Sequence, residues 1–311
     1  MSGKRIAAVL LALVCALGLF GCEKAGKTQA DGKLQIVATL FPQYDFARQV
    51  AGEYAEVTLL LPPGVESHSF EPTPADIIKI NEADLFIYTG EYMEPWAQSI
   101  IDGLTGDVQV LDISRNIPLD EEAAHEDEDG DAHEHGGFDP HIWTSPANAI
   151  LMVDNLSAEL CAIDPEHAGD YQTAAAAYKA QLDELDQEFQ EIVDGAQYKE
   201  IVFGGRFAMH YFAKRYGLSY LAAFDSCSSE TEPSAKAVAQ IIDEINEKHL
   251  PAIFHEELAD PKVSRMIAEE TGVKLLLLHS CHNVSKEEAE SGATYLSLMQ
   301  QNAENLREGL V

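Results

Sequence analysis

The stretch "HEDEDGDAHEHGGFDPHIW", residues 125–143, holds four of the eleven histidines of the chain among many Asp and Glu residues. Imidazole nitrogens and carboxylate oxygens are common ligands of divalent metal ions, so this stretch suggests metal binding. Its first part has high charge and no apolar periodicity, which predicts a disordered acidic loop over residues 120–137. This loop either binds zinc weakly or is merely solvated; its histidines are His125, His133 and His135. We expect the structured part to begin at Asp139.

His141 lies in the motif "FDPHIWTSP", directly after Pro140 and before the bulky Ile142 and Trp143. An imidazole in rigid, apolar surroundings is pre-oriented and partly desolvated, which favours the neutral form that binds metals. Asp139 could instead be a local turn residue. Of all the motifs in the chain this one is the most specific, and it makes His141 a candidate metal ligand.

Two further loops carry histidines next to expected strand ends, where ligands bind in open α/β sheets. The first, "PPGVESHSFEPTPADI", places Glu66 and His68 between prolines. The second, "HSCHNVS", contains His279 and His282. Histidines three apart can approach one metal, although alternation in an extended segment can also point them to opposite sides. We favour His282 as a ligand, whereas His279 either joins the site or faces the core.

Short apolar runs alternate with helix-length segments from Leu34 onward, a pattern typical of parallel strands joined by crossover helices. A length of 311 residues also favours two domains. We therefore expect two α/β lobes, each with a mostly parallel sheet flanked by helices. The runs cover residues 34–40, 57–61, 84–90 and 108–114 in the first half, and 201–205, 218–224, 251–257 and 273–280 in the second.

One long amphipathic segment separates the two sets of runs. Asp164 and Pro165 provide an N-cap and a first-turn proline, and Asp194-Gly195 provides an end. Apolar residues recur every three or four positions between them, which predicts a helix that joins the lobes. The expected parts are a first lobe (34–163), the linking helix (164–195) and a second lobe (196–311).

The N-terminal sequence "MSGKRIAAVLLALVCALGLFGC" has a basic start and a short apolar run, which predicts a secretory signal over residues 1–21. Its end resembles a bacterial lipoprotein cleavage site, with Cys22 as the lipid-bearing residue and 22–33 as a flexible tether. We therefore expect an extracytoplasmic, membrane-anchored protein. A net charge of -33 excludes general attraction to nucleic acid and suits a protein that handles cations.

Three cysteines remain beyond Cys22: Cys161, Cys227 and Cys281. An odd number leaves at least one thiol without a partner inside the monomer. Cys227 and Cys281 form the preferred disulfide pair because both follow strand-like runs. Three buried free thiols are the alternative.

Several blocks resemble those of the substrate-binding lipoproteins of bacterial zinc and manganese ABC transporters, from about residue 35 to the C-terminus. They read "PPGVESHSFEPTPADI", "DPHIWTSP", "YFAKRYGL", "EETGVKLLLLH" and "TYLSLMQQNAENL". The resemblance implies two α/β lobes joined by one long helix, with a metal ion between them that is delivered to a permease. It also implies His68 and His141 as ligands. Similar histidine-rich loops in this family suggest that the acidic loop passes zinc to the cleft.

The chain departs from the family pattern at Arg206, where a histidine or glutamate ligand is usual. A guanidinium group has no lone pair to donate, so Arg206 cannot be a ligand. We expect it to pair with Asp225, Glu230 or Glu232. His210 lies nearby, and we expect it to be a packed or surface residue.

The expected ligand set is therefore His68, His141 and His282, with His279 or Glu257 completing it. Three imidazoles suit Zn²⁺ better than Mn²⁺, although manganese, nickel and cobalt remain open. Affinity should fall below a pH of about 6.5 as histidines take up protons.

The function that follows is capture of a divalent metal by a monomeric receptor, not catalysis. A zinc hydrolase with Glu66 or Glu257 as general base is one alternative, but the chain has no HExxH or GxSxG motif. A surface adhesin with a structural metal is another.

Overall fold

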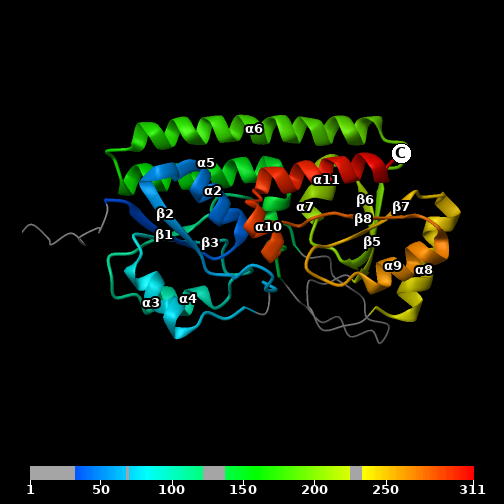
Figure 1. Ribbon diagram of the computed structural model, residues 1–311, viewed down its shortest axis with the longest axis horizontal. Coiled ribbons are helices and arrows are strands. Elements are labelled where there is room, and N and C mark those ends of the chain that lie inside the picture. Colours follow the sequence, from blue (N-terminus) through cyan, green and yellow to red (C-terminus); the bar gives the residue numbers. More distant parts are fainter. Residues whose placement is uncertain (1–31, 68–69, 122–136, 225–232) are drawn as a thin grey trace, which may run out of the picture. The chain divides into compact units, whose positions relative to one another are not determined.

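The computed structural model describes residues 32–67, 70–121, 137–224 and 233–311 (Figure 1). Residues Leu34–Val311 form one compact unit. The expected signal sequence, Cys22 and nearly all of the tether lie outside the described residues, as do His68, Cys227 and most of the acidic loop. Within the described ranges, no helix combines the length and the apolar character needed to cross a membrane.

The first sheet consists of four parallel strands in the order β2-β1-β3-β4. Its strands are β1 (Leu34–Ala38), β2 (Ala55–Leu59), β3 (Leu85–Tyr88) and β4 (Gln109–Asp112). Its connecting helices are α2 (Phe41–Ala51), the short η1 (Gly52–Tyr54), α3 (Pro74–Glu82) and α4 (Ala97–Asp102).

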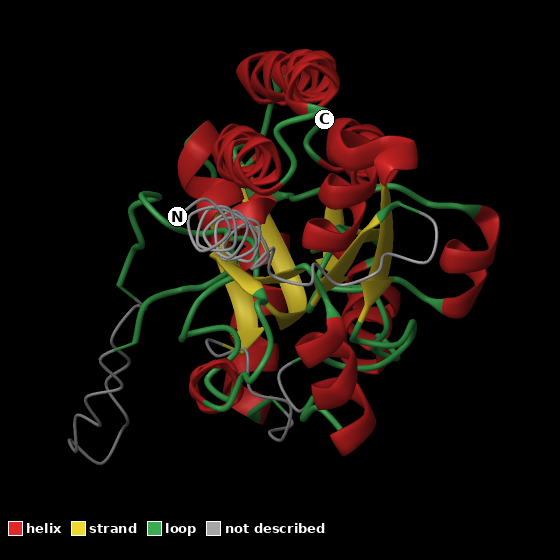
Figure 2. Ribbon diagram, turned by 90° about the vertical axis from the view of Figure 1, so that its left-hand side faces the viewer, coloured by secondary structure: helices red, strands yellow, loops and turns green. Residues whose placement is uncertain are grey.

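The second sheet repeats this arrangement in the order β6-β5-β7-β8, again with parallel pairing. Its strands are β5 (Glu200–Arg206), β6 (Ser219–Phe224), β7 (Ala252–His255) and β8 (Lys274–Leu277). The helices of this half are α7 (His210–Tyr216), α8 (Ala235–Lys248), α9 (Lys262–Thr271), α10 (Lys286–Ser291) and α11 (Tyr295–Gly309). Figure 2 shows the strands of both sheets between helices on either side. The predicted fold class is thereby confirmed, and each of the eight apolar runs overlaps a strand.

The linking segment folds as two antiparallel helices, α5 (Pro146–Ile163) and α6 (Ala168–Gly195). Helix α6 runs beside α5 and α11 (Figure 1) and also contacts α2. Its start differs from the prediction, because Asp164 is the C-cap of α5 and not the N-cap of the long helix. The Asp164 carboxylate accepts hydrogen bonds from His167 Nδ1 (2.7 Å) and Tyr171 Oη (2.6 Å), which stabilise the turn. The exact lobe boundaries remain a prediction.

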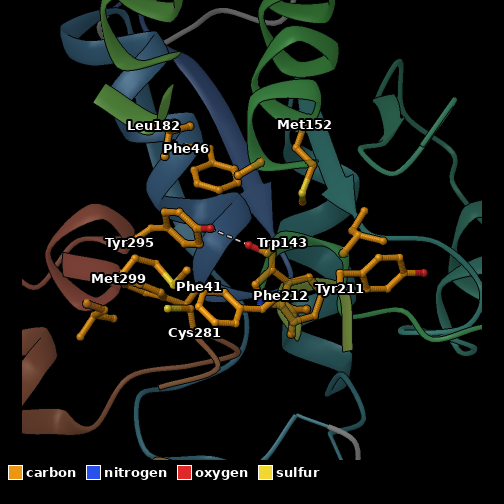
Figure 3. Packing of buried hydrophobic residues seen from close by; sticks show 14 of the residues in the cluster. Phe41, Phe46, Trp143, Met152, Leu182, Tyr211, Phe212, Cys281, Tyr295 and Met299 are labelled. Atoms are coloured by element: carbon orange, nitrogen blue, oxygen red, sulfur yellow. Dashed lines mark hydrogen bonds between the residues drawn. The ribbon is translucent and has the colours of Figure 1, made fainter. Parts of the chain in front are cut away.

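One large hydrophobic cluster joins the two sheets and one face of α6, and each sheet also has a smaller cluster of its own. Figure 3 shows Tyr295 and Trp143 within the large cluster. Tyr295, at the start of α11, donates a hydrogen bond from its hydroxyl to the carbonyl of Trp143 (2.5 Å), and its amide donates to Asp45 Oδ2 (2.9 Å). The ring of Tyr295 also packs edge-on against Phe46 of α2 at a centroid distance of 5.0 Å. Because these buried contacts would have to break, the core restricts movement of one sheet against the other.

The two sheets differ at the point where the strand order reverses, which in this fold is the usual ligand position. In the first sheet that point lies between β1 and β3, and buried polar side chains fill it. Gln43 Oε1 accepts hydrogen bonds from the amide (3.0 Å) and hydroxyl (2.7 Å) of Thr39. Glu94 also hydrogen-bonds with the Thr39 hydroxyl, and it accepts from the Thr89 amide and Gln43 Nε2. These mutually bonded groups occupy this end of the first sheet.

Burial raises the pKa of Glu94 to about 7, although three hydrogen-bond donors lower it in part. In the unfolded chain this carboxyl titrates near 4.5. The native state therefore holds a proton between these values that the unfolded state releases, so stability contributed by Glu94 is lost as pH rises towards 7.

Replacing Glu94 by Gln should remove this pH dependence. The free energy of unfolding of Glu94→Gln minus that of the wild type should increase from pH 5 to pH 8, because only the wild type must ionise a buried group. Chemical denaturation at several pH values measures the difference, with the exposed Glu91→Gln as a control. A wild-type-to-variant difference that stays constant over this range would contradict the assignment.

Candidate metal site

The imidazole rings of His141 and His282 meet at the junction between the two halves of the fold. Their centroids lie 4.5 Å apart with ring planes at 72°. His141 directly precedes the short helix η2 (Ile142–Thr144), and His282 lies in the loop after β8. Trp143 packs against both rings, with centroids at 5.5 Å and 5.1 Å. Two of the predicted ligands are thus adjacent although they are far apart in the sequence.

Asp139 holds the ring of His141 in place. Its Oδ1 accepts hydrogen bonds from the His141 amide (2.8 Å) and from Nδ1 (2.7 Å). Burial alone would raise the pKa of Asp139, but the charge and hydrogen bonds of His141 outweigh it and lower the pKa. A carboxylate at Nδ1 keeps the proton there and leaves the lone pair on Nε2, which is the arrangement found behind metal-binding histidines. The aspartate therefore serves as both the expected turn residue and an orienting group.

Helix α7 fixes the backbone of this segment. The Tyr211 hydroxyl donates a hydrogen bond to the carbonyl of Asp139 (2.7 Å) and accepts one from the amide of Asp120 (2.9 Å). The side chain of Tyr211 is labelled in Figure 3. His210 Nε2 lies 3.2 Å from Asp120 Oδ2, and its part-buried side chain is compatible with the expected packed or surface role. The two ends of the acidic loop are thereby held next to the His141 segment.

His282 is oriented through a hydroxyl group. Ser280 donates from Oγ to Glu257 Oε1 (2.5 Å) and from its amide to Oε2 (2.7 Å). Since the hydroxyl proton points to Glu257, the Ser280 oxygen accepts from His282 Nδ1. Trp143 Nε1 also donates to the carbonyl of Ser280 (2.8 Å). The lone pair of His282 is therefore also left on Nε2, which is a buried atom.

The side chain of His279 is buried in the core. Its side chain is only 1% exposed, and its Nδ1 accepts a hydrogen bond from the amide of Cys281 (2.9 Å). Its Nε2 lies 3.6 Å from Glu288 Oε1, and the Asn302 side chain bonds both its backbone amide and its carbonyl. Of the two expectations for His279, its position supports the core-facing one.

A cavity of about 140 Å³ opens beside His282. The first half contributes the loop Gly64–Ser67 to its wall, and the second half contributes Arg206, Glu256, Glu257 and Asn283. Asn283 Nδ2 donates to the carbonyls of Pro62 (2.8 Å) and Val65 (2.9 Å), which fixes the first loop against the second half. His68 follows this loop in the sequence but lies outside the described residues.

Arg206 lies in the cavity wall between two carboxylates. Its Nη1 is 3.7 Å from Glu66 Oε1, and its Nε is 3.7 Å from Glu256 Oε1. The expected partners Asp225, Glu230 and Glu232 lie outside the described residues. Glu256 was not predicted as a site residue, although its place at the end of the strand-like run 251–257, beside Glu257, was a usable signal.

Among the described residues, no group of three or more His, Cys, Asp or Glu side chains has a metal-binding arrangement. The two converging histidines thus lack a third ligand there, and the expected third ligand, His68, is not described.

Cys281 is a free, fully buried thiol, so the preferred disulfide with Cys227 is wrong. Its φ of +61° turns the chain so that the thiol enters the core while His282 faces the cavity.

Comparison with known proteins places these features in a family. The sequence profile of a family described as ZnuA, zinc-uptake complex component A, periplasmic, matches residues 36–309. The chain is 35% identical over 314 residues to the high-affinity zinc uptake system protein ZnuA of Bacillus subtilis, covering 100% of this chain and 98% of that protein. It is 34% identical to the zinc-binding lipoprotein AdcA of Streptococcus pneumoniae over 96% of this chain. The chain spans only 60% of the length of that streptococcal relative.

Solved structures agree with this fold. The Zn(II)-bound ZnuA-like domain of Streptococcus pneumoniae AdcA has a TM-score of 0.76 at 32% identity, covering 90% of this chain and 99% of that domain. The laminin binding protein Lmb of Streptococcus agalactiae, described as bifunctional with adhesin and metal transporting activity, has a TM-score of 0.78 at 29% identity, covering 90% of this chain and 100% of that chain.

Changing Asp139 to Asn should weaken zinc binding about 10-fold to 100-fold, because loss of a carboxylate behind a histidine ligand usually has an effect of this size. The amide can still accept a hydrogen bond, so the fold should persist. Calorimetric titration with zinc measures the change. Asp183→Asn, at an exposed position on α6, serves as the matched control and should bind as the wild type does. Equal affinity of Asp139→Asn and wild type would show that Asp139 does not support a ligand.

Proposed function

The chain belongs to the ZnuA family of zinc-uptake components, and we propose that it captures zinc outside the cytoplasm and delivers it to an ABC transporter permease. The observation that carries this proposal is the convergence of His141 and His282 from the two halves of the fold, each with its Nδ1 bonded. The zinc-binding descriptions of the relatives support it.

We propose His68, His141 and His282 as the ligands. Ser67, which precedes His68 in the sequence, lines the same cavity as His282. Glu257 lies 4.0 Å from the Nδ1 side of His282 and binds Ser280 with both oxygens, a position that suits orientation of the ring. Imidazole ligands favour Zn²⁺ over the harder Mn²⁺, and a manganese receptor of the same type is the alternative.

Capture and release of an ion require no bond cleavage. A hydrolase would need a general base close to the metal, and the candidate Glu257 accepts two hydrogen bonds from Ser280 instead. This use of Glu257 supports a receptor over an enzyme. The N-terminal sequence, together with the description of a relative as a lipoprotein, supports attachment to the membrane through Cys22. A monomer remains our expectation.

Changing His141 to Ala should lower zinc affinity at least tenfold, because one of the proposed ligands is lost. Deleting residues 125–136 should change affinity little, since the proposed ligands lie outside that segment. Calorimetry with purified protein measures both. His167→Ala provides a control, because His167 pairs with Asp164 and stacks on Tyr54 instead of approaching the cavity.

Equal zinc affinity of His141→Ala and wild type would refute the site. Removal of the metal with a chelator distinguishes a transported ion from an ion that the fold requires. Because the hydrophobic core is continuous across both halves, the chelated protein should keep its circular dichroism spectrum, whereas unfolding on chelation would favour the adhesin with a structural metal.

A further inference from the structure

Arg206 is directed into the cavity by an irregularity in its strand. The pairing of β5 with β6 shifts register between Phe203 and Arg206, where Gly204 and Gly205 lie. Such bulges bend a strand and re-aim the side chain that follows. Arg206 ends β5, next to the end of β7, so it lies where the strand order of the second sheet reverses. In this fold that is the usual ligand position.

Strand β7, the neighbour of β5, is followed by a carboxylate that lies close to the Arg206 guanidinium. Glu256 directly follows β7, and a Cβ atom at position 205 would collide with its carboxylate. Gly205 therefore lets this carboxylate lie against the backbone of β5. Burial raises the pKa of Glu256 to about 6, and the charge of Arg206 is among the influences that lower it. The side chain of Glu256 is 17% exposed and that of Arg206 is 22% exposed.

Glu66 brings a second carboxylate from the other half of the fold. It lies 3.7 Å from the guanidinium and is 33% exposed. Glu66, Glu256 and His282 all line the same cavity. Carboxylate oxygens prefer hard cations such as Mn²⁺, whereas imidazole suits Zn²⁺. The cavity thus contains potential oxygen ligands beside the proposed nitrogen ligands.

We infer that Arg206 is a specificity-determining residue: its guanidinium neutralises Glu66 and Glu256 and keeps both from ligating the metal, so that zinc is bound in preference to manganese. This inference rests on the proposed function. A guanidinium is always charged and has no lone pair, so it opposes the carboxylates without contributing a ligand. Selectivity then comes from removing hard ligands as well as from supplying imidazoles.

The test compares Zn²⁺ and Mn²⁺ affinities of purified variants by calorimetry. Arg206→Met removes the charge, keeps a long apolar stem and adds no oxygen. Manganese affinity should rise at least tenfold and zinc affinity should change less than threefold. Arg206→Lys keeps the charge and should stay close to wild type. The remote Arg307→Met, which loses an exposed pair with Glu188, is the matched control and should change neither affinity.

A combined variant identifies the new ligands. Adding Glu66→Gln and Glu256→Gln to Arg206→Met should cancel the gain in manganese affinity. The same two changes in the wild-type background should leave the zinc-to-manganese affinity ratio within threefold, because neither carboxylate is a ligand there. This last measurement decides the matter if Arg206→Met does not fold.

Several results would overturn the inference: unchanged manganese affinity in Arg206→Met, an equal rise for both metals, or a gain that survives loss of both carboxylates. A ratio shifted more than threefold by Glu66→Gln and Glu256→Gln alone would do the same. Each of these leaves zinc capture by the wild type intact. Absence of zinc binding in the wild type would instead refute the proposed function.

Discussion

An imidazole ring can donate a lone pair to a metal only from a nitrogen that carries no proton, and the site is built around this constraint. His141 meets it with a direct hydrogen bond from Nδ1 to Asp139, and His282 meets it through Ser280 to Glu257. Both rings therefore keep the proton on Nδ1 and the lone pair on Nε2. The two histidines are thus oriented by different hydrogen-bond partners, and each keeps its lone pair on Nε2.

This chemistry depends on packing, because the two rings must stay close together. The core common to both sheets holds them, with Trp143 in contact with both rings and bonded to the Ser280 loop. Asn283 fixes the Pro62–Val65 loop across the same junction. Contacts of this kind favour a preformed site, in which little ordering is needed when the ion binds.

Local sequence patterns predicted much of this structure. The eight apolar runs gave the strands, and the proline-flanked "DPHIW" motif drew attention to His141. The start of the long helix was misplaced because Asp164-Pro165 has the composition of an N-cap, while the apolar segment before it forms a helix that ends there.

Long-range contacts could not be predicted in this way. No local pattern shows that Ser280 links His282 to Glu257, or that Arg206 lies between Glu66 and Glu256. These neighbours come from separate strands and loops, so only the fold brings them together. The disulfide prediction failed for a similar reason, since strand-like flanks do not reveal that the Cys281 thiol points into the core.

X-ray absorption spectroscopy of the zinc-loaded protein tests the central claim most directly, because it reports the atoms bound to the ion. Cys281 directly precedes His282, so nitrogen and sulfur ligation are sharply distinguished at this site. The account predicts imidazole nitrogens at about 2.0–2.1 Å with no sulfur, and one imidazole fewer in His141→Ala. A sulfur ligand at about 2.3 Å, or an imidazole signal unchanged by loss of His141, would contradict it.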